Sequence, residues 1–372
     1  MALVGHSPSE GDEIERPYFR YRDFDSIQHL LSLQYRTKSQ SRFKNRYSPL
    51  RGAIPAGSTS AISDWRPVPS TVAQAFEAHR DSAAVGPRYV VVISEPDPVA
   101  PRVAREWGTP PATGTHVEGA PLRDLGEGRL VLRRAGWHIH DEGLDRHLPA
   151  TLREARPTLI FPSIHRSEQN VACLTTHPLG NLGPTADFGG RPRTVVPTDS
   201  RAMASVLRRL SELGAVEGLG ATFESTHHGP ELGVPAFFVE IGYGTAPEAP
   251  TSAVRILSRA IREFEPDPGD KVAMGVGGGH YAPHFTELTL RRRWAFGHIL
   301  SRHSLDAVDA PTAREAYRAT LPAEGILYAR AADAEHAALQ GLAPRLRDAE
   351  AESRPSGSGK GEASGDARSS GT

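Results

Sequence analysis

Apolar residues gather into short runs that have the length and composition of buried strands. The first run, "RYVVVIS" at 88–94, is rich in β-branched residues and is followed by the turn-forming "EPDP". Five similar runs follow along the chain: "RLVLRRA" (129–135), "TLIFPS" (158–163), "ATFEST" (221–226), "PAFFVEI" (235–241) and "KVAMGV" (271–276). Continuous apolar runs of this kind predict strands that are covered on both faces.

Two amphipathic helices are predicted between these strands. In "SRAMASVLRRLSEL" (200–213) the apolar positions form one stripe, and Gly214 marks the predicted end of the helix. The segment "TSAVRILSRAIREF" (251–264) repeats the pattern. Strands that alternate with helices are typical of the α/β class. We therefore expect a mixed, largely parallel sheet that is flanked by helices on both faces.

Composition divides the chain into three parts. Residues 88–343 carry the regular pattern and are expected to form one domain. Residues 344–372 are predicted to be a disordered tail, because the Gly/Ser-rich segment at 351–372 lacks the apolar surface that folding requires. Residues 1–87, which include "YRTKSQSRFKNRY" (35–47), are predicted to be a poorly ordered extension. The interleaved Arg and aromatic residues leave an RNA-contacting arm as the alternative.

Charge and cysteine content narrow the class of protein. The 372 residues carry a formal net charge of −1, which gives the molecule no overall preference for nucleic acid, although a local basic surface is compatible with it. Cys173 is the one cysteine, which excludes an intramolecular disulfide and a zinc site built from Cys pairs. There is no signal-peptide pattern and no apolar run long enough to span a bilayer. We expect a globular, monomeric, cytoplasmic protein without a membrane partner.

Histidines and glycines gather where the predicted strands end. The loops after three of these strands contain six of the sixteen histidines. They carry His165, Arg166, His177 and Asn181 after 158–163, His227 and His228 after 221–226, and Gly277, Gly278, Gly279, His280, Tyr281 and His284 after 271–276. The carboxyl ends of parallel strands lie along one edge of a sheet, so we expect these loops to meet. Adjacent histidines usually point apart, so at most one of the pair at 227–228 is expected to face a shared site.

A cluster of imidazoles serves either divalent-metal binding or proton transfer. Two or three histidines with a carboxylate such as Glu240 or Glu287 would hold zinc and leave one position for water, whose pKa the metal lowers to about 7. The glycines at 277–279 permit close approach of a ligand, so their amides are candidates for binding an oxyanion. The simpler alternative is that each histidine is an ordinary surface residue.

Two common catalytic motifs are absent from the sequence. "GVGGG" at 275–279 lacks the Lys-Ser/Thr pair of a phosphate-binding P-loop. No Gly-x-Ser-x-Gly elbow of a serine hydrolase is present, and the apolar surroundings of Cys173 indicate a buried, unreactive thiol. The histidines are therefore the strongest candidates for chemistry.

Five stretches resemble the motifs of archaeal and plant D-aminoacyl-tRNA deacylases. They are "VVVISEPDPVA" (90–100), "HRSEQNVACLTTHPLGN" (165–181), "STHHGP" (225–230), "GVGGGHYAP" (275–283) and "AFGHIL" (295–300). The resemblance covers about residues 88–343 and implies an α/β core like that of phosphorylases and peptidyl-tRNA hydrolases. It also implies a zinc-dependent enzyme of translation quality control, which hydrolyses the ester between a D-amino acid and the 3′ end of tRNA.

The resemblance and the histidine pattern together predict the roles of individual residues. The predicted catalytic residues are His165, His177, His227, His228, His280 and Tyr281. The predicted zinc ligands are His227, His228, His280 and Glu240, with one or both of the adjacent histidines used. Contacts to the substrate or oxyanion are predicted for Gly277, Gly278, Gly279, Arg166 and Asn181. In this scheme zinc activates a water molecule, and His165 or His177 donates a proton to the leaving adenosine hydroxyl.

Two other classes of protein fit the same residues. A metal-dependent amidase or peptidase would use the same histidines and cleave amides without tRNA. A non-catalytic RNA-binding module would bind uncharged tRNA and would not need the histidines. For the deacylase, discrimination between D and L esters must come from pocket shape. A glycyl ester, which has no side chain, is expected to pass such a filter.

Overall fold

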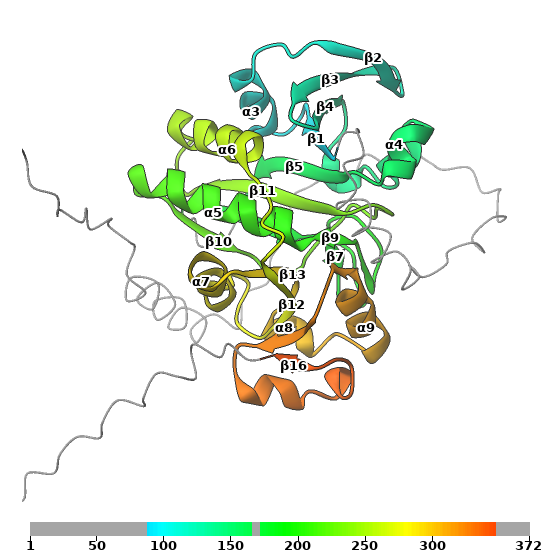
Figure 1. Cartoon of the computed structure of the whole chain (residues 1–372), viewed down its shortest axis with the longest axis vertical. Helices are drawn as coiled ribbons and strands as arrows, with labels where there is room; N and C mark the ends of the chain where they lie inside the picture. Colours follow the sequence, from blue (N-terminus) through cyan, green and yellow to red (C-terminus); the bar gives the residue numbers. More distant parts are fainter. Residues whose placement is uncertain (1–87, 166–171, 347–372) are drawn as a thin grey trace, which may run out of the picture.

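The computed structural model describes residues 88–165 and 172–346 (Figure 1). The predicted extension at 1–87, the predicted site residue Arg166 and the chain after residue 346 lie outside the described residues.

The larger of two main sheets contains eight strands in the order β10-β6-β11-β5-β1-β4-β3-β2. The strands are β1 (Tyr89–Ser94), β2 (Ala112–Val117), β3 (Ala120–Gly126), β4 (Arg129–Arg134), β5 (Thr158–Ile164), β6 (Ala172–Pro178), β10 (Gly220–Phe223) and β11 (Ala236–Tyr243). Strand β1 pairs in parallel with β4 and β5, β5 with β11, and β6 with β10. The pairs β6–β11, β2–β3 and β3–β4 are antiparallel. The predicted mixed, largely parallel sheet is confirmed.

Both faces of this sheet are covered, because side chains alternate between two apolar clusters. Val91 of β1 points into a cluster shared with the helices α3 (Ala100–Glu106), α5 (Ser200–Val216) and α6 (Thr251–Glu263). Val92 points into the opposite cluster, which is covered by the 3-10 helices η1 (His138–His140) and η2 (Leu144–His147) and by α4 (Ala150–Ala155). Figure 1 shows α5 and α6 side by side on the first face.

A second, smaller sheet lies beside the first. It has four parallel strands in the order β13-β12-β15-β16, namely β13 (Trp294–Leu300), β12 (Lys271–Val276), β15 (Gly325–Tyr328) and β16 (Arg345–Leu346). One face packs against α5 and α7 (Pro283–Arg292), and the other packs against α9 (Ala310–Ala319). The core cluster under α5 contains residues of both sheets, so the two sheets share one hydrophobic core.

Short elements complete the described part of the chain. Two small ladders pair β7 (Gly180–Asn181) with β8 (Thr194–Val195) and β9 (Thr198–Asp199) with β14 (Thr320–Leu321). The remaining elements are α8 (Arg302–Leu305), η3 (Ala331–Glu335) and η4 (Ala337–Leu339). No helix in residues 88–165 and 172–346 is long and apolar enough to cross a membrane.

All six predicted strands and both predicted helices are present, but β10 ends at Phe223 instead of residue 226, and three other details differ. Helix α5 continues past Gly214 to Val216, since this glycine serves a close contact instead of a cap: a Cβ there would lie 2.7 Å from the Leu219 carbonyl oxygen. Strand β16 lies beyond the predicted domain boundary at residue 343. Strand β6 occupies part of the segment that was predicted to be a loop, and His177 lies within it.

Candidate active site at the junction of the two sheets

Strand β10 ends at Phe223, and the residues after it run between the two sheets. The backbone N–H of Glu224 donates to the Thr176 carbonyl of β6, at 3.0 Å. Two residues later, the N–H of Thr226 donates to the Ile299 carbonyl of β13, at 2.8 Å. This segment therefore joins the end of one sheet to the end of the other, and the predicted histidine loops meet there.

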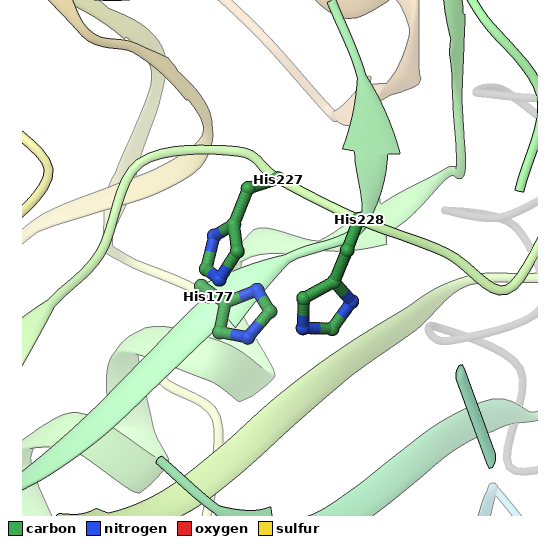
Figure 2. Close-up of side chains that lie close together, drawn as sticks. All are labelled: His177, His227 and His228. Carbon is green, nitrogen blue, oxygen red and sulfur yellow. The ribbon is translucent and has the colours of Figure 1, made fainter. Parts of the chain in front are cut away.

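Three histidines, His177, His227 and His228, form the first group at this junction. Figure 2 shows their rings turned toward one another, with His177 on a strand and the other two on the adjoining loop. The ring centroid of His177 lies 4.0 Å from that of His227 and 4.9 Å from that of His228. One nitrogen from each ring can be chosen so that all three lie within 4.8 Å of one another, which is the spacing of a metal-binding group.

The hydrogen bonds of these rings decide which nitrogen is available. A backbone carbonyl only accepts hydrogen bonds, so a ring nitrogen beside one must carry a proton. In all three histidines this nitrogen is Nδ1, at 2.7 Å from the Ser225 carbonyl for His227, 2.7 Å from Gly229 for His228 and 3.1 Å from Pro178 for His177. Nε2 is therefore the ring nitrogen that remains for a metal in each histidine, an orientation that backbone carbonyls also give to histidines in metal sites.

The electrostatic environment keeps two of the three rings neutral. Burial lowers the pKa of His227 well below its usual value, and the neighbouring His177 and His228 lower it further. Burial and His177 likewise lower the pKa of His228 to about 4. Burial also disfavours the charged form of His177, but hydrogen bonding and the charge of Glu240 outweigh it and raise its pKa. His227 and His228 are therefore in the neutral form that binds metals at neutral pH.

Both adjacent histidines face the group, contrary to the prediction that at most one would. The backbone of His228 has φ = 43°, which turns its side chain to the same side as that of His227. The next residue, Gly229, is packed so closely that a Cβ would lie 2.2 Å from the Gly190 nitrogen. The amide of Asn181 donates to the Gly189 carbonyl at 2.8 Å and so supports the loop behind His228.

The second group consists of His165, Glu224 and His280. Nε2 of His280 lies 2.8 Å from Oε2 of Glu224, and Nδ1 of His165 lies 3.1 Å from Oε1. The two groups adjoin, because Nε2 of His227 is 3.7 Å from Oε2 of the same carboxylate. Glu224 is thus surrounded by ring nitrogens of three histidines.

The carboxylate of Glu224 is fully buried, yet within the described residues neither of its oxygens accepts a hydrogen bond of acceptable geometry. Burial by itself raises the pKa of this group, but the charge of His165 and the nearby His280 hold it well below its usual range. A buried carboxylate without aligned donors is costly unless a cation balances it. The carboxylate of Glu224 and the ring nitrogens of His165 and His280 form a group that could hold a metal ion.

His165 is held as an imidazolium. Burial opposes its charge, but the carboxylates of Glu224 and Glu240 outweigh burial and raise its pKa to about 10. Both of its ring nitrogens then donate: Nδ1 lies 3.3 Å from Oε2 of Glu240, and Nε2 lies 2.9 Å from the Tyr281 hydroxyl. A charged ring cannot ligate a metal, whereas it can donate a proton.

Glu240 lies behind the two groups and belongs to neither. Besides its contact to His165, its Oε1 is 3.8 Å from Nε2 of His177. Burial raises the pKa of Glu240, but hydrogen bonding to His165 and His177 outweighs burial and lowers this pKa to about 2. The predicted metal ligand Glu240 is therefore placed as an ionised residue that orients histidines.

The glycine loop lies at the edge of the site. The N–H of Gly277 donates to the Leu300 carbonyl at 2.8 Å, so this predicted oxyanion donor is already used in pairing the loop with β13. Gly278 has φ = 81° and no atom within 4 Å of the position of a Cβ, which leaves open space above it. His280 follows with 45% of its side chain exposed, so the site opens to solvent on this side.

Cys173 lies near the site without belonging to either histidine group. Its sulfur is 4.0 Å from the Tyr281 hydroxyl. Burial, reinforced by the negative charge of Glu224, raises the pKa of the thiol to about 12. At neutral pH the thiol is protonated, in agreement with the predicted unreactive cysteine.

Sequence reasoning missed Glu224, the residue on which the second group is centred. The alternative carboxylate Glu287 lies on α7, where it is 40% exposed and pairs with Arg291 at 3.4 Å. A signal for Glu224 was present: it is an acidic residue inside the apolar run "ATFEST", three positions before His227. A carboxylate in a buried strand is costly and is usually there for a partner.

The residues of the site lie within a match to a known protein family. The family model described as D-aminoacyl-tRNA deacylase matches residues 153–341, a range that includes both histidine groups. The D-aminoacyl-tRNA deacylase of Thermoplasma acidophilum is 38% identical over 172 residues, which cover 44% of this chain and 65% of that protein. That of Methanosarcina acetivorans is 38% identical over 184 residues, covering 48% and 61%. That of Thermoplasma volcanium is 35% identical over 187 residues, covering 50% and 69%.

The chain thus spans less than two thirds of the length of the first two relatives. Among solved structures, AF0625, a conserved protein of unknown function, has a TM-score of 0.58 and 26% sequence identity, and the match covers 65% of this chain and 86% of that one. Because the family model matches half of the sequence and the match includes the whole site, the chain belongs to the D-aminoacyl-tRNA deacylase family.

Proposed function

We propose that this protein hydrolyses the ester that links a D-amino acid to the 3′ end of tRNA, and that it uses zinc. The observation that carries the proposal is the group formed by His177, His227 and His228, with one ring nitrogen of each within 4.8 Å of the others, beside the buried carboxylate of Glu224. A site that combines metal ligands with an imidazolium has the groups that ester hydrolysis requires. The activity named for the relatives is the reaction that this site would perform.

The residues present fit a zinc ion. Three imidazole nitrogens with one open position are a common catalytic zinc set. His227 and His228 are neutral, and His177, whose Nε2 is buried without a hydrogen bond in the described part of the chain, would release its proton on binding the ion. We assign His177, His227 and His228 as the ligands, with Glu224 and His280 beside them. When bound there, zinc supplies a water molecule of lowered pKa and polarises the ester carbonyl.

Side chains of the protein carry out the proton transfers, with Glu224 as the acceptor and His165 and Tyr281 as the donors. Glu224 is placed to accept the proton that the attacking water loses, since neither of its oxygens is held by an aligned donor among the described residues. His165 donates through its Nε2–H to the Tyr281 hydroxyl. Tyr281 passes a proton to the 3′-oxygen of the ribose as the carbon–oxygen bond breaks, and His165 restores it. The products are free tRNA and the D-amino acid.

Stabilisation of the oxyanion is assigned to the loop before His280. Because the Gly277 amide is engaged with Leu300, the amides of Gly278 and Gly279 are the candidates that remain. The open space above Gly278 is where the ester would lie. A glycyl ester has no side chain for a chiral pocket to reject, so removal of glycine from mischarged tRNA belongs to the same proposal.

A deacylation time course tests the proposal. D-tyrosyl-tRNA, L-tyrosyl-tRNA and glycyl-tRNA are each incubated with the full chain, with zinc or with a chelator. We expect loss of the D and glycyl esters only, abolished by the chelator and reduced at least 100-fold in His228→Ala. His116→Ala, an exposed histidine on β2 at the far edge of the larger sheet, is the matched control and should retain full activity.

The other outcomes identify the alternatives. Cleavage of amide or peptide substrates without dependence on tRNA would indicate an amidase or peptidase. Binding of uncharged tRNA that survives His228→Ala, together with esters that are no less stable in the presence of protein than in buffer, would indicate an RNA-binding module. A cytoplasmic location and a monomeric state are part of the proposal, and size-exclusion chromatography with light scattering checks the second.

A further inference from the structure

Two exposed arginines lie at the carboxyl ends of the strands beside the site. Arg302 comes two residues after the end of β13, and Arg330 comes two residues after the end of β15. Strand β12 lies between these two parallel strands and is followed by the loop that carries His280. The side chains of Arg302 and Arg330 are 50% and 57% exposed. Ligands of α/β sheets bind at such ends.

Both arginines share one buried carboxylate. Nε of Arg302 lies 3.6 Å from Oδ1 of Asp333, and Nε of Arg330 lies 3.8 Å from its Oδ2. The Asp333 side chain is only 6% exposed, and within the described residues its Oδ2 accepts no hydrogen bond. Two cations thus face one anion at distances too long for hydrogen bonds. The cluster keeps a surplus positive charge and its guanidinium donors.

Two other exposed arginines of the described chain, Arg259 and Arg133, are paired differently. Arg259 lies 3.0 Å from Glu263 on the same helix, and Arg133 lies 2.6 Å from Glu95. In these pairs an accessible carboxylate takes the guanidinium hydrogen bonds directly. The Arg302–Arg330 pair is instead oriented by a buried carboxylate and faces solvent.

The backbone fixes the pair to the glycine loop of the site. Gly277 has φ = 108°, and a Cβ there would lie 2.3 Å from Oδ2 of Asp333, so only glycine allows the carboxylate to approach this closely. The N–H of Arg302 donates to the Gly278 carbonyl at 3.0 Å. The arginine pair and His280 are therefore held by one loop, and there is open space above Gly278 of this loop.

We propose that Arg302 and Arg330 bind a backbone phosphate near the 3′ end of the tRNA substrate. The inference rests on the proposed function, in which the ester is attached to the last ribose, so that the nearest phosphates lie within one or two nucleotides of the histidines. Guanidinium forks match the oxygens of a phosphodiester, and phosphate contacts position a nucleic acid without reading its sequence. This phosphate-binding site would determine how far the terminal nucleoside reaches toward the histidines.

Two substrates separate phosphate binding from catalysis. One is D-tyrosyl-tRNA, and the other is D-tyrosine esterified to adenosine, which contains no phosphate. Arg302→Ala and Arg330→Ala should each raise KM for the tRNA substrate about tenfold, the effect of one lost charge-assisted contact. The kcat for the tRNA substrate and all constants for the adenosine ester should stay within about twofold. Arg259→Ala is the matched control and should behave like wild type in both assays.

A binding measurement keeps the inference separate from the proposed function. Fluorescence anisotropy of a labelled, uncharged RNA that ends in the tRNA acceptor strand is recorded over a salt series. Arg302→Ala/Arg330→Ala should weaken binding and reduce the slope of log affinity against log salt by about 0.7 for each phosphate released. If the wild-type protein hydrolyses neither ester but binds the RNA more tightly than the double variant does, the proposed function is wrong and the phosphate-binding site is still supported.

Three results would overturn the inference. One is an equal effect of the substitutions on the tRNA substrate and on the adenosine ester, or no effect on either. Another is unchanged RNA binding and salt slope in the double variant. The third is displacement of the RNA by an equal concentration of inorganic phosphate, which would identify the pair as a site for free phosphate. Thermal melting of each variant ensures that a fall in binding does not reflect loss of the fold.

Discussion

At the scale of single residues, the site depends on where a few protons lie. Each of His177, His227 and His228 gives its Nδ1 proton to a backbone carbonyl, so the identity of the free nitrogen is fixed by the main chain. His165 is the exception, because two carboxylates keep it charged. One cluster of similar side chains thereby contains both ligand-like and acid-like imidazoles.

Glu224 is predicted to be the residue whose charge matters most. Glu224→Gln keeps the shape of the side chain but removes the anion that faces His165, His227 and His280. We expect deacylation to fall at least 100-fold and zinc affinity to fall about 10-fold to 100-fold. Rates on D-tyrosyl-tRNA and zinc titration followed by elemental analysis measure the two effects. Glu287→Gln on α7 is the control, and equal losses in both variants would contradict the assignment.

The pH dependence of folding is predicted to contain a contribution from His298. This residue is fully buried in β13, where Nδ1 lies 3.1 Å from the Thr226 hydroxyl and Nε2 lies 2.9 Å from the Val196 carbonyl. Burial lowers its pKa from 6.5 to about 4. The unfolded chain binds this proton at a higher pH than the folded one, so stability is fully present above pH 6.5 and is lost as the pH falls toward 4.

The expected loss over this range is about 3 kcal/mol for His298 alone. Urea unfolding between pH 7 and pH 4 measures it, and His298→Gln should be less stable at pH 7 but lose less stability on acidification. His227 and His228 also have lowered pKa values, so they too reduce stability as the pH falls. Because they are present in both proteins, the difference in pH dependence between variant and wild type reports on His298. Parallel curves for the two proteins would disprove the contribution.

At the scale of elements, the loop after β12 combines two demands. Gly277 must lie against Asp333 in a left-handed conformation, whereas Gly279 has no positive φ and its nearest neighbour to an added Cβ is 3.7 Å away. Only the first glycine is thus required by packing. The loop holds His280 on one side and the Asp333 carboxylate on the other, so its conformation affects both.

The two glycines therefore give a matched pair of substitutions. Gly277→Ala should cost about 2 kcal/mol or more, because the methyl group meets Asp333 and the backbone is strained. Gly279→Ala should change stability by less than about 0.5 kcal/mol. Thermal unfolding compares them, with the larger loss expected to lower Tm by several degrees. Equal melting temperatures for the two variants would mean that Asp333 moves away without cost.

Some strands and helices can be predicted from the sequence and others cannot. Continuous apolar runs such as "YVVVIS" and "AFFVEI" identify buried strands, and the periodic stripe of residues 200–213 identifies α5. Strand β6 was missed because "ACLTTHP" mixes polar and apolar residues, although all but the first of them are buried. Division into two sheets was also missed, since pairing between distant strands leaves no local pattern.

The same reasoning explains what was predicted of the site. The histidine loops were found because strand ends converge in any such sheet. The grouping of His177 with His227 and His228, and the part played by Glu224, depend on the bridge between the two sheets. The spacing of residues along the sequence does not reveal that the segment 224–226 connects the two sheets.

At the scale of the whole molecule, the smaller sheet is completed by its last strand. Residues 345 and 346 form β16, which pairs in parallel with β15, and Leu346 packs so closely on Gly325 that a Cβ there would lie 2.8 Å from Leu346 Cγ. A chain cut at residue 343 loses this strand and exposes the edge of β15.

Truncation therefore provides a prediction about the boundary of the domain. A protein of residues 88–346 should melt at least several degrees higher than one of residues 88–343, because the shorter chain loses the β15–β16 hydrogen bonds and the burial of Leu346. Differential scanning calorimetry of the two proteins measures the difference. Identical melting temperatures would show that β16 contributes nothing and that the boundary lies at 343.

The segment between the two sheets has a consequence for cooperativity. His177 and Glu240 belong to one sheet and His280 follows a strand of the other, while Glu224 is hydrogen-bonded to the first sheet and Thr226 to the second. Neither sheet contains a complete set of reactive groups, and a single hydrophobic core serves the two. The chemistry therefore has no separable module that could be inherited or transplanted alone, and loss of activity on denaturation should coincide with global unfolding.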